Sequence, residues 1–277
     1  MKLVVGNWKM YPRTLSEAKR IVETMTRLAS PARNIQTGGR HEQVNVVLCP
    51  PALFIAPLLA LSKNTQIVIG AQNTFILDEG AYTGETSPYA LASLGATHVI
   101  LGHSERRLLG EVDALISKKV TRAAHNKLRV ILCVGERLRD DAGAYFTEVG
   151  NELRASLEGF PRSEIKRLII AYEPIWAIGA NALSAAEPKD FREMSIFIRR
   201  ILVDRFGKKA GFVVPILYGG SVDDRNAEGF LREGGADGFL VGRASLDPKK
   251  FAAIIETASL RSSKCNAPSG LRTRRTH

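Results

Sequence analysis

Three side chains suited to proton transfer stand at or just beyond the ends of apolar runs in this sequence. Glu173 follows Leu-Ile-Ile-Ala-Tyr, His103 follows Val-Ile-Leu-Gly, and Lys9 comes two residues after Leu-Val-Val-Gly-Asn. A carboxylate at the mouth of an apolar strand is partly desolvated, which makes it a better base. A histidine that opens a helix stays neutral, because the helix dipole disfavours its positive charge. A base, a neutral hydrogen-bond donor and a cation together suit proton abstraction next to a carbonyl, with electrostatic stabilisation of the enediolate.

Each of these residues also has a purely structural interpretation. Glu173 could pair with a neighbouring lysine or arginine, His103 could hydrogen-bond to backbone, and Lys9 could be a solvated surface lysine. We interpret His98 and His125 as structural. The sequence alone leaves these alternatives open.

Two glycine turns favour a binding site for an anion. Gly219-Gly220-Ser221 and Gly242-Arg243 each follow an apolar run. Backbone N–H groups approach a phosphate closely where no side chain intervenes. A simple tight turn would use the same residues, so the turns by themselves are weak evidence for phosphate.

Eight strand-like runs recur along the chain with helical stretches between them. Most carry Val, Ile or Leu on successive positions, which indicates strands buried on both faces of a parallel sheet. The runs are Leu3–Asn7, Val44–Cys49, Gln66–Ala71, Thr97–Gly102, Arg129–Val134, Leu168–Glu173, Val213–Tyr218 and Gly238–Gly242. Eight such units predict a single α/β domain, a (β/α)₈ barrel, whose carboxyl rim would gather the residues named above.

The intervening segments carry helix signals. Thr14–Glu17 reads as a capping box, and Asp247-Pro248 as an N-cap followed by proline at the first helical position. Residues 142–157 and 191–206 are amphipathic. A doubly wound open sheet is the alternative fold, but the sequence contains neither G-x-G-x-x-G nor G-x-x-x-x-G-K-[ST]. One further amphipathic stripe steps along Leu15, Ala18, Val22, Met25 and Ala29.

The charge of the chain is concentrated near its end. The net charge is +11 over 277 residues, and the last 17 residues carry five basic residues and no acid. We therefore divide the chain into a barrel domain at 1–260 and a basic tail at 261–277, which we expect to be disordered. The polar stretch 31–43 is expected to be a loop insertion on the face of the barrel away from the chemistry.

The remaining composition argues against several classes of protein. No apolar run approaches the length of a membrane-spanning helix, and the N-terminus turns polar too early for a signal peptide. Cys49, Cys133 and Cys265 form no C-x-x-C pair, so no metal site is expected, and we predict a cytoplasmic protein.

Six motifs resemble those of the triosephosphate isomerases, in that family's order and spacing, between about residues 2 and 259. The resemblance implies a (β/α)₈ barrel that interconverts dihydroxyacetone phosphate and D-glyceraldehyde 3-phosphate in glycolysis and gluconeogenesis. It also implies a homodimer that needs no cofactor or metal. From the composition and the distribution of charge we expect no membrane partner and regard nucleic acid as an unfavoured partner. The motifs are Gly6–Met10, Gly70–Asn73, Tyr82–Glu85, Leu101–Arg107, Ala171–Gly179 and Tyr218–Val222.

The same resemblance implies roles for the rim residues. Glu173 looks like the base, His103 like the electrophile at the carbonyl oxygen, and Lys9 with Asn7 like the substrate-binding and oxyanion-stabilising pair. Glu105 is similar to a buried carboxylate near that lysine.

The resemblance extends to the phosphate site, the lid and the subunit interface. Gly179, Ser221 and the backbone of Gly242-Arg243 match the phosphate-binding positions. Residues 174–176 resemble the first hinge of a lid, and Thr83 matches a residue that reaches the partner's site.

Three features depart from the family pattern. The lid tip reads Gly179-Ala180-Asn181-Ala182 in place of Gly-Thr-Gly-Lys, an arginine follows Gly242, and the basic tail extends past the usual end. Arg243 either points outward or strengthens the anion site. Two other functions remain: another phosphate-binding barrel isomerase, or a catalytically silent barrel that binds polyanions through its tail.

Overall fold

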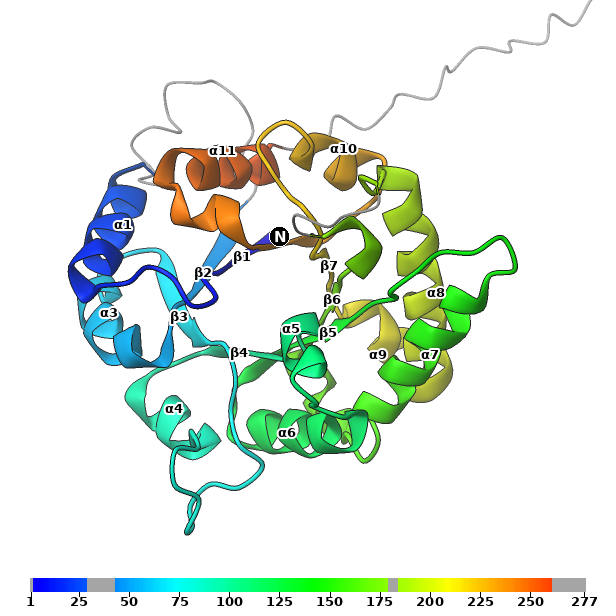
Figure 1. Cartoon of the computed structure of the whole chain (residues 1–277), viewed down its shortest axis with the longest axis horizontal. Helices are drawn as coiled ribbons and strands as arrows, with labels where there is room; N and C mark the ends of the chain where they lie inside the picture. The colour runs from blue at the N-terminus through cyan, green and yellow to red at the C-terminus, as the bar shows by residue number, and fades with distance from the viewer. Residues whose placement is uncertain (1, 29–42, 179–183, 261–277) are drawn as a thin grey trace, which may run out of the picture.

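Eight parallel strands close into a barrel in the order β1 to β8, as predicted. The structure is a computed structural model that describes residues 2–28, 43–178 and 184–260. Figure 1 looks onto the barrel with its ring of helices outside. The strands are β1 Lys2–Asn7, β2 Val44–Cys49, β3 Ile67–Ala71, β4 His98–Leu101, β5 Arg129–Val134, β6 Leu168–Tyr172, β7 Ile216–Tyr218 and β8 Gly238–Val241.

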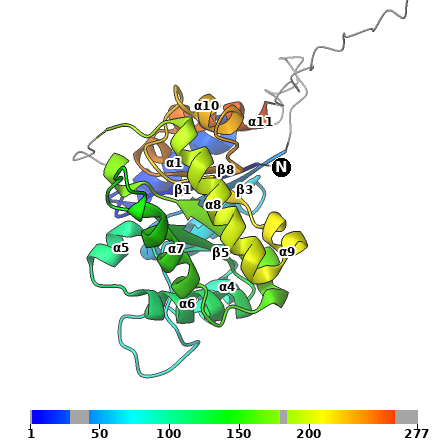
Figure 2. The ribbon, with the colours of Figure 1, turned by 90° about the vertical axis from the view of Figure 1, so that its right-hand side faces the viewer.

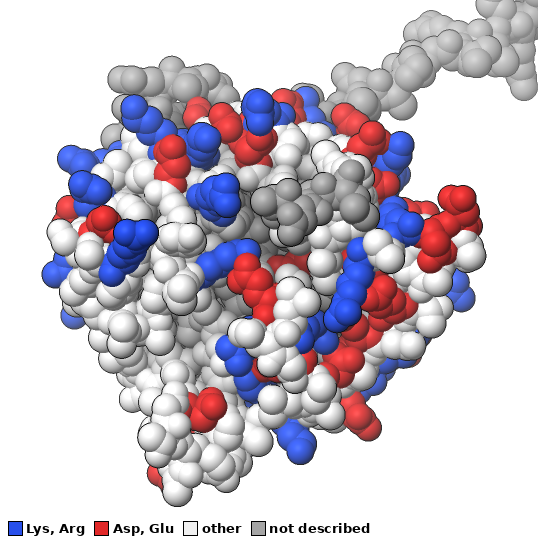
Figure 3. All heavy atoms as spheres, viewed as in Figure 1, with Lys and Arg blue, Asp and Glu red and all other residues white. Residues whose placement is uncertain are grey.

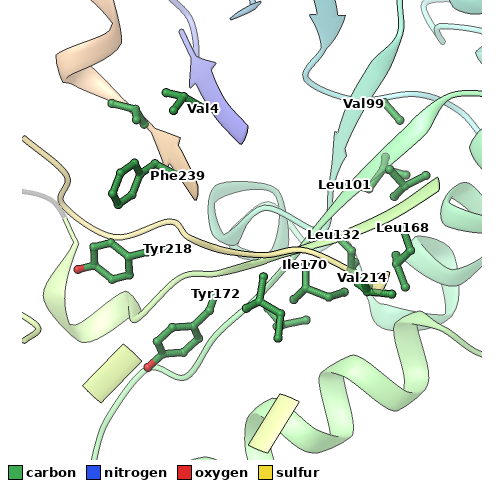
Figure 4. Close-up of a cluster of buried hydrophobic side chains, with 14 of the residues drawn as sticks. Val4, Val99, Leu101, Leu132, Leu168, Ile170, Tyr172, Val214, Tyr218 and Phe239 are labelled. Atoms are coloured by element: carbon green, nitrogen blue, oxygen red, sulfur yellow. The ribbon is translucent and has the colours of Figure 1, made fainter. Parts of the chain in front are cut away.

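Two layers of core explain the continuous apolar runs. Along each strand alternate side chains point to opposite faces, so Leu3 and Val5 fill the barrel interior while Val4 packs outward. The outward layer is the larger one, and Figure 4 shows part of it, with Tyr172, Tyr218 and other side chains from neighbouring strands. Because both faces are covered, polar groups stay buried chiefly near the strand ends.

Helices surround the strands, as the side view in Figure 2 also shows. The α-helices are α1 Leu15–Leu28, α3 Ile55–Ser62, α4 Pro88–Leu94, α5 Ser104–Leu108, α6 Asp113–His125, α7 Ala144–Ser156, α8 Pro188–Phe206, α9 Lys208–Val213, α10 Ala227–Arg232 and α11 Pro248–Ser259. Short 3₁₀ turns complete the order: η2 Ala52–Phe54, η3 Arg162–Arg167, η4 Ile175–Ala177 and η5 Arg243–Leu246. Among the described residues, no helix is long and apolar enough to span a membrane.

The predicted helix starts are largely confirmed. Asp247 accepts hydrogen bonds from the backbone N–H groups of Lys249 and Lys250, with Pro248 at the first helical position. Thr14 accepts one from the N–H of Glu17 at 3.2 Å, which is half of the predicted capping box.

The strand predicted at Val213–Tyr218 starts later in the structure than predicted. Val213 ends α9, and β7 starts only at Ile216. Pro215 supplies no N–H for a strand ladder, and the Val214 carbonyl accepts a hydrogen bond from Arg199 at 2.5 Å. The short apolar segment before the proline is therefore helical at its start and then a connection.

Three predictions fall wholly or mainly on residues outside the described part of the chain. They concern the insertion at 31–43, of which only Gln43 is described, the altered lid tip at 179–182, and the basic tail at 261–277.

Candidate active site

A cavity of about 520 Å³ opens at the carboxyl ends of the strands. It is lined by the predicted catalytic residues Lys9, His103 and Glu173, which come from the loops after β1, β4 and β6. The glycine turns after β7 and β8 line it as well. Of the predicted site residues, only Gly179 lies outside the described residues.

The base and the histidine meet directly. Glu173 Oε1 lies 3.1 Å from His103 Nε2, and Glu173 Oε2 accepts a hydrogen bond from the backbone N–H of Ser104 at 3.1 Å. Both side chains are nearly buried, at 3% and 10% exposed. The lysine and arginine partners of the structural alternative are not found for Glu173 among the described residues.

The hydrogen bonds of His103 determine its protonation state. His103 caps α5, and its Nδ1 accepts from the backbone N–H of Glu105 at 3.2 Å. A nitrogen that accepts carries no proton, so the imidazole is neutral and its one N–H is on Nε2. That N–H points directly to the carboxylate of Glu173.

The backbone at Lys9 adopts a left-handed conformation, with φ of 53°. This is uncommon outside glycine and is held here by two hydrogen bonds. The Lys9 N–H donates to Asn7 Oδ1 at 3.1 Å, and its carbonyl accepts from Gln72 Nε2 at 2.8 Å. The same Gln72 amide also bonds the carbonyl of Cys49 at 2.8 Å, so strands β1, β2 and β3 jointly fix the lysine.

These contacts add a role for Asn7 and differ from one expectation for Glu105. Asn7 positions Lys9 through its side-chain oxygen, a role that the sequence did not assign to it. Glu105 forms an ion pair with the Lys9 ammonium, as the resemblance implied, but its side chain is 54% exposed in the single chain rather than buried. Glu105 occupies the exposed first turn of a short helix, which explains the difference.

Of the two glycine turns, the one after β8 leaves room for an anion. Gly242 is open, because a Cβ there would meet only Lys9 Cε at 3.8 Å. Ser221 donates its hydroxyl to the Ala177 carbonyl at 3.1 Å, so this side chain ties the β7 turn to η4. Arg243 is exposed, lines the cavity and has no ion-pair partner within the described residues.

Gly219 packs closely against the side chain of Glu173. A Cβ at Gly219 would lie 3.0 Å from Glu173 Cγ and 3.2 Å from the Tyr172 carbonyl oxygen. Only a hydrogen atom fits between this turn and the carboxylate side chain. The glycine therefore serves the packing of Glu173 as well as any approach to phosphate.

The sequence analysis missed a buried carboxylate that binds β6 and η4. Glu136 follows β5 and is fully buried, and its Oε1 accepts from Tyr172 Oη at 2.6 Å and Trp176 Nε1 at 2.8 Å. Arg139 Nε donates to the same oxygen at 3.1 Å. The guanidinium carbon of Arg139 lies 5.5 Å from the centroid of the Trp176 ring. A carboxylate just beyond an apolar strand was the signal used for Glu173, and it marks Glu136 equally.

His98 and Cys49 do not line the cavity, whereas Cys133 lies beside Glu173, and burial together with the Glu173 charge raises the pKa of its thiol. His98 is buried at the start of β4, where burial and nearby Arg129 lower its pKa to about 3. Cys49 and Cys133 are buried free thiols, and burial raises the pKa of each well above its ordinary value. Within the ranges that the structure describes, no cluster of His, Cys, Asp and Glu could hold a metal ion.

Comparisons with known proteins agree with this geometry. The family model "Triosephosphate isomerase" matches residues 2–258. The triosephosphate isomerase of Roseiflexus castenholzii is 42% identical over 259 residues, covering 93% of this chain and 97% of that protein. The enzyme of the same name from Caldanaerobacter subterraneus subsp. tengcongensis is 40% identical over 255 residues, covering 91% and 98%. This chain belongs to the triosephosphate isomerase family.

Proposed function

We propose specific roles for the cavity residues in the triose-phosphate isomerase reaction of this chain, the interconversion of dihydroxyacetone phosphate and D-glyceraldehyde 3-phosphate. The observation that carries the proposal is the pairing of a buried carboxylate with a neutral imidazole N–H at 3.1 Å inside one cavity. A carbonyl substrate that displaces this direct contact meets Glu173 as a base and the His103 N–H as a hydrogen-bond donor.

The reaction then needs only proton transfers. Glu173 removes the proton from C1 of dihydroxyacetone phosphate, and the electron pair of that C–H bond forms the C1–C2 double bond of the enediolate. His103 donates its Nε2–H hydrogen bond to the oxygen that gains negative charge, while the Lys9 ammonium stabilises the same charge. His103 passes its Nε2 proton to O2 and takes the hydroxyl proton of O1 in exchange, which moves the negative charge to O1. Glu173 then returns the carbon-bound proton to C2, which gives the aldehyde at C1 and restores the carboxylate.

Substrate affinity comes from the glycine turns. The backbone at 219–221 and Gly242 binds the phosphate, and Arg243 at the mouth adds positive charge. Gly179 belongs to the same proposal through the family resemblance alone. The ion pair with Glu105 keeps the lysine aimed from its left-handed backbone into the cavity.

A homodimer is part of the proposal. Large apolar side chains stand exposed in the loops after β1, β2, β3 and β4, which are neighbours in the barrel. Exposed apolar side chains on adjacent loops indicate a protein interface. Thr83 lies exposed in the β3 loop, where a partner subunit would meet it. The apolar side chains are Met10, Leu53, Leu77, Tyr82, Leu108 and Leu109.

The direct test is a coupled assay of triose-phosphate isomerisation by the purified chain and by Glu173→Gln. We expect the variant to fold and bind substrate but to lose most of its turnover, because the amide accepts no proton. Analytical ultracentrifugation of the same sample tests the dimer. Wild-type turnover in Glu173→Gln would exclude Glu173 as the base.

The proposed location is cytoplasmic, which the buried free thiols Cys49 and Cys133 support.

A further inference from the structure

A second hollow adjoins the active-site cavity. It has a volume of about 530 Å³ and lies between α1 and the η5–α11 segment. Tyr11 and Leu246 line both hollows, so the groove continues from the mouth of the active site. Its apolar floor includes Ile21 and Pro248.

The groove carries positive charge that the fold does not use. Arg13 and Arg20 line it, are exposed, and have no ion-pair or hydrogen-bond partner for their guanidinium groups within the described residues. Arg243 lines the adjoining cavity and is likewise exposed, with no partner for its guanidinium group within the described residues. Figure 3 shows Lys and Arg side chains over α1 and over the η5–α11 segment, beside the central hollow.

Two acids offset part of this positive charge. Glu17 lies between Arg13 and Arg20 in the sequence and lines the same groove, without a direct ion pair to either, so the groove keeps a net positive charge. The Asp247 side chain accepts hydrogen bonds from the backbone N–H groups of Lys249 and Lys250 at the start of α11. The ammonium groups of those two lysines, both exposed, add further positive charge beside Pro248.

We propose that this groove is a second anion subsite, which takes the distal phosphate of an extended bisphosphate whose other phosphate occupies the glycine cradle. The inference rests on the proposed function in placing that first phosphate. The methylene or sugar chain of the ligand crosses Tyr11 and Leu246, and Arg13 with Arg20 meets the distal phosphate. Such a ligand is a competitive inhibitor, because it fills the catalytic cavity without presenting a reactive carbonyl to Glu173.

The charge and the continuity of the two hollows favour this occupant. A ligand confined to the active site would not reach α1, and a polyanion that binds the surface alone would not need a groove open to the catalytic cavity. A bisphosphate uses both hollows at once. The stronger binding of a bisphosphate over a monophosphate depends on exposed arginines, so it weakens as the salt concentration rises.

The test compares pentane-1,5-diol bisphosphate with pentyl phosphate as inhibitors of triose-phosphate isomerisation, followed by the propane and octane analogues. The proteins are the wild type, the double variant Arg13→Ser/Arg20→Ser, and the control Arg192→Ser/Lys209→Ser. The control removes two exposed cations, from α8 and α9. Neither double variant is expected to change kcat or KM for the triose phosphates by more than about twofold.

We expect at least one bisphosphate to inhibit the wild type and the control roughly three- to tenfold more strongly than its monophosphate, as two exposed ion pairs allow. The double variant and 0.5 M salt remove the difference. If the monophosphates compete with substrate but no bisphosphate of any chain length inhibits more strongly than its monophosphate, the subsite is overturned and the glycine cradle is not. A gain that persists in Arg13→Ser/Arg20→Ser, or inhibition that is not competitive, also overturns it. Failure of the monophosphates to compete overturns the proposed glycine cradle, and the subsite with it.

Discussion

The substitution Gly219→Ala tests whether the turn after β7 positions the catalytic base. The added Cβ would lie 3.0 Å from Glu173 Cγ and 3.2 Å from the Tyr172 carbonyl oxygen. Both contacts are tighter than ordinary ones, so one neighbour must move by a few tenths of an ångström. Gly219 is not at positive φ, and alanine adds no backbone strain there. The side chain of Glu173 is the more mobile neighbour and is expected to give way.

That displacement acts on turnover. A shift of 1 Å in a reacting group costs roughly 10²-fold, so a shift of a few tenths of an ångström should lower kcat by about three- to tenfold. Steady-state kinetics measures the loss, and a crystal structure of the variant measures the displacement. Gly242→Ala is the contrast, since its Cβ would meet only Lys9 Cε at 3.8 Å. It should raise KM more than it lowers kcat. Wild-type kcat in Gly219→Ala, or an unmoved Glu173 in its structure, would refute the reasoning.

Four shorter predictions concern the base, the electrophile, a buried acid and the tail. Glu173→Asp retracts the carboxylate by one methylene and should lower kcat far more than it changes KM, so equal losses in both constants would count against it. For His103, ¹⁵N NMR should show a neutral ring protonated at Nε2, and His103→Gln should lose turnover while its circular dichroism is unchanged; a ring protonated at Nδ1 contradicts the mechanism. Burial raises the pKa of Glu152 from 4.5 to about 7, so the folded chain holds a proton that the unfolded chain releases, and stability falls as pH rises through this range. Glu152→Gln should therefore gain up to about 3 kcal/mol on the wild type between pH 4.5 and 7 in thermal melts, and a constant difference would refute this. Deletion of 261–277 should leave activity and melting temperature nearly unchanged, and a drop of several degrees would show that the tail packs on the barrel.

The sequence predicted the barrel well because its signals are local. Continuous apolar runs mark strands covered on both faces, and Thr14 and Asp247 mark helix starts through contacts within one turn. Strand ends in a parallel barrel share one rim, so the order of elements alone brought Lys9, His103 and Glu173 into one cavity.

The contacts that tune the site were beyond the sequence because they join distant segments. Ser104 binds Glu173 across 69 positions, and Gln72 reaches Lys9 across 63. Those pairings depend on the register of neighbouring strands, which periodicity does not reveal. The left-handed backbone at Lys9 was equally hidden, because a non-glycine residue gives no sign that its partners hold it there.

Two glycines on opposite sides of β6 show how the fold positions its base by leaving side chains out. Gly135 follows β5, and a Cβ there would lie 1.7 Å from the Glu173 carbonyl oxygen. Gly219 follows β7 and clears the Glu173 side chain in the same way. The flanking strands therefore approach both the backbone and the side chain of Glu173 closely enough that any Cβ would displace it. The hydrogen bonds from Ser104 and His103 then select one orientation of a carboxylate that backbone packing has already placed.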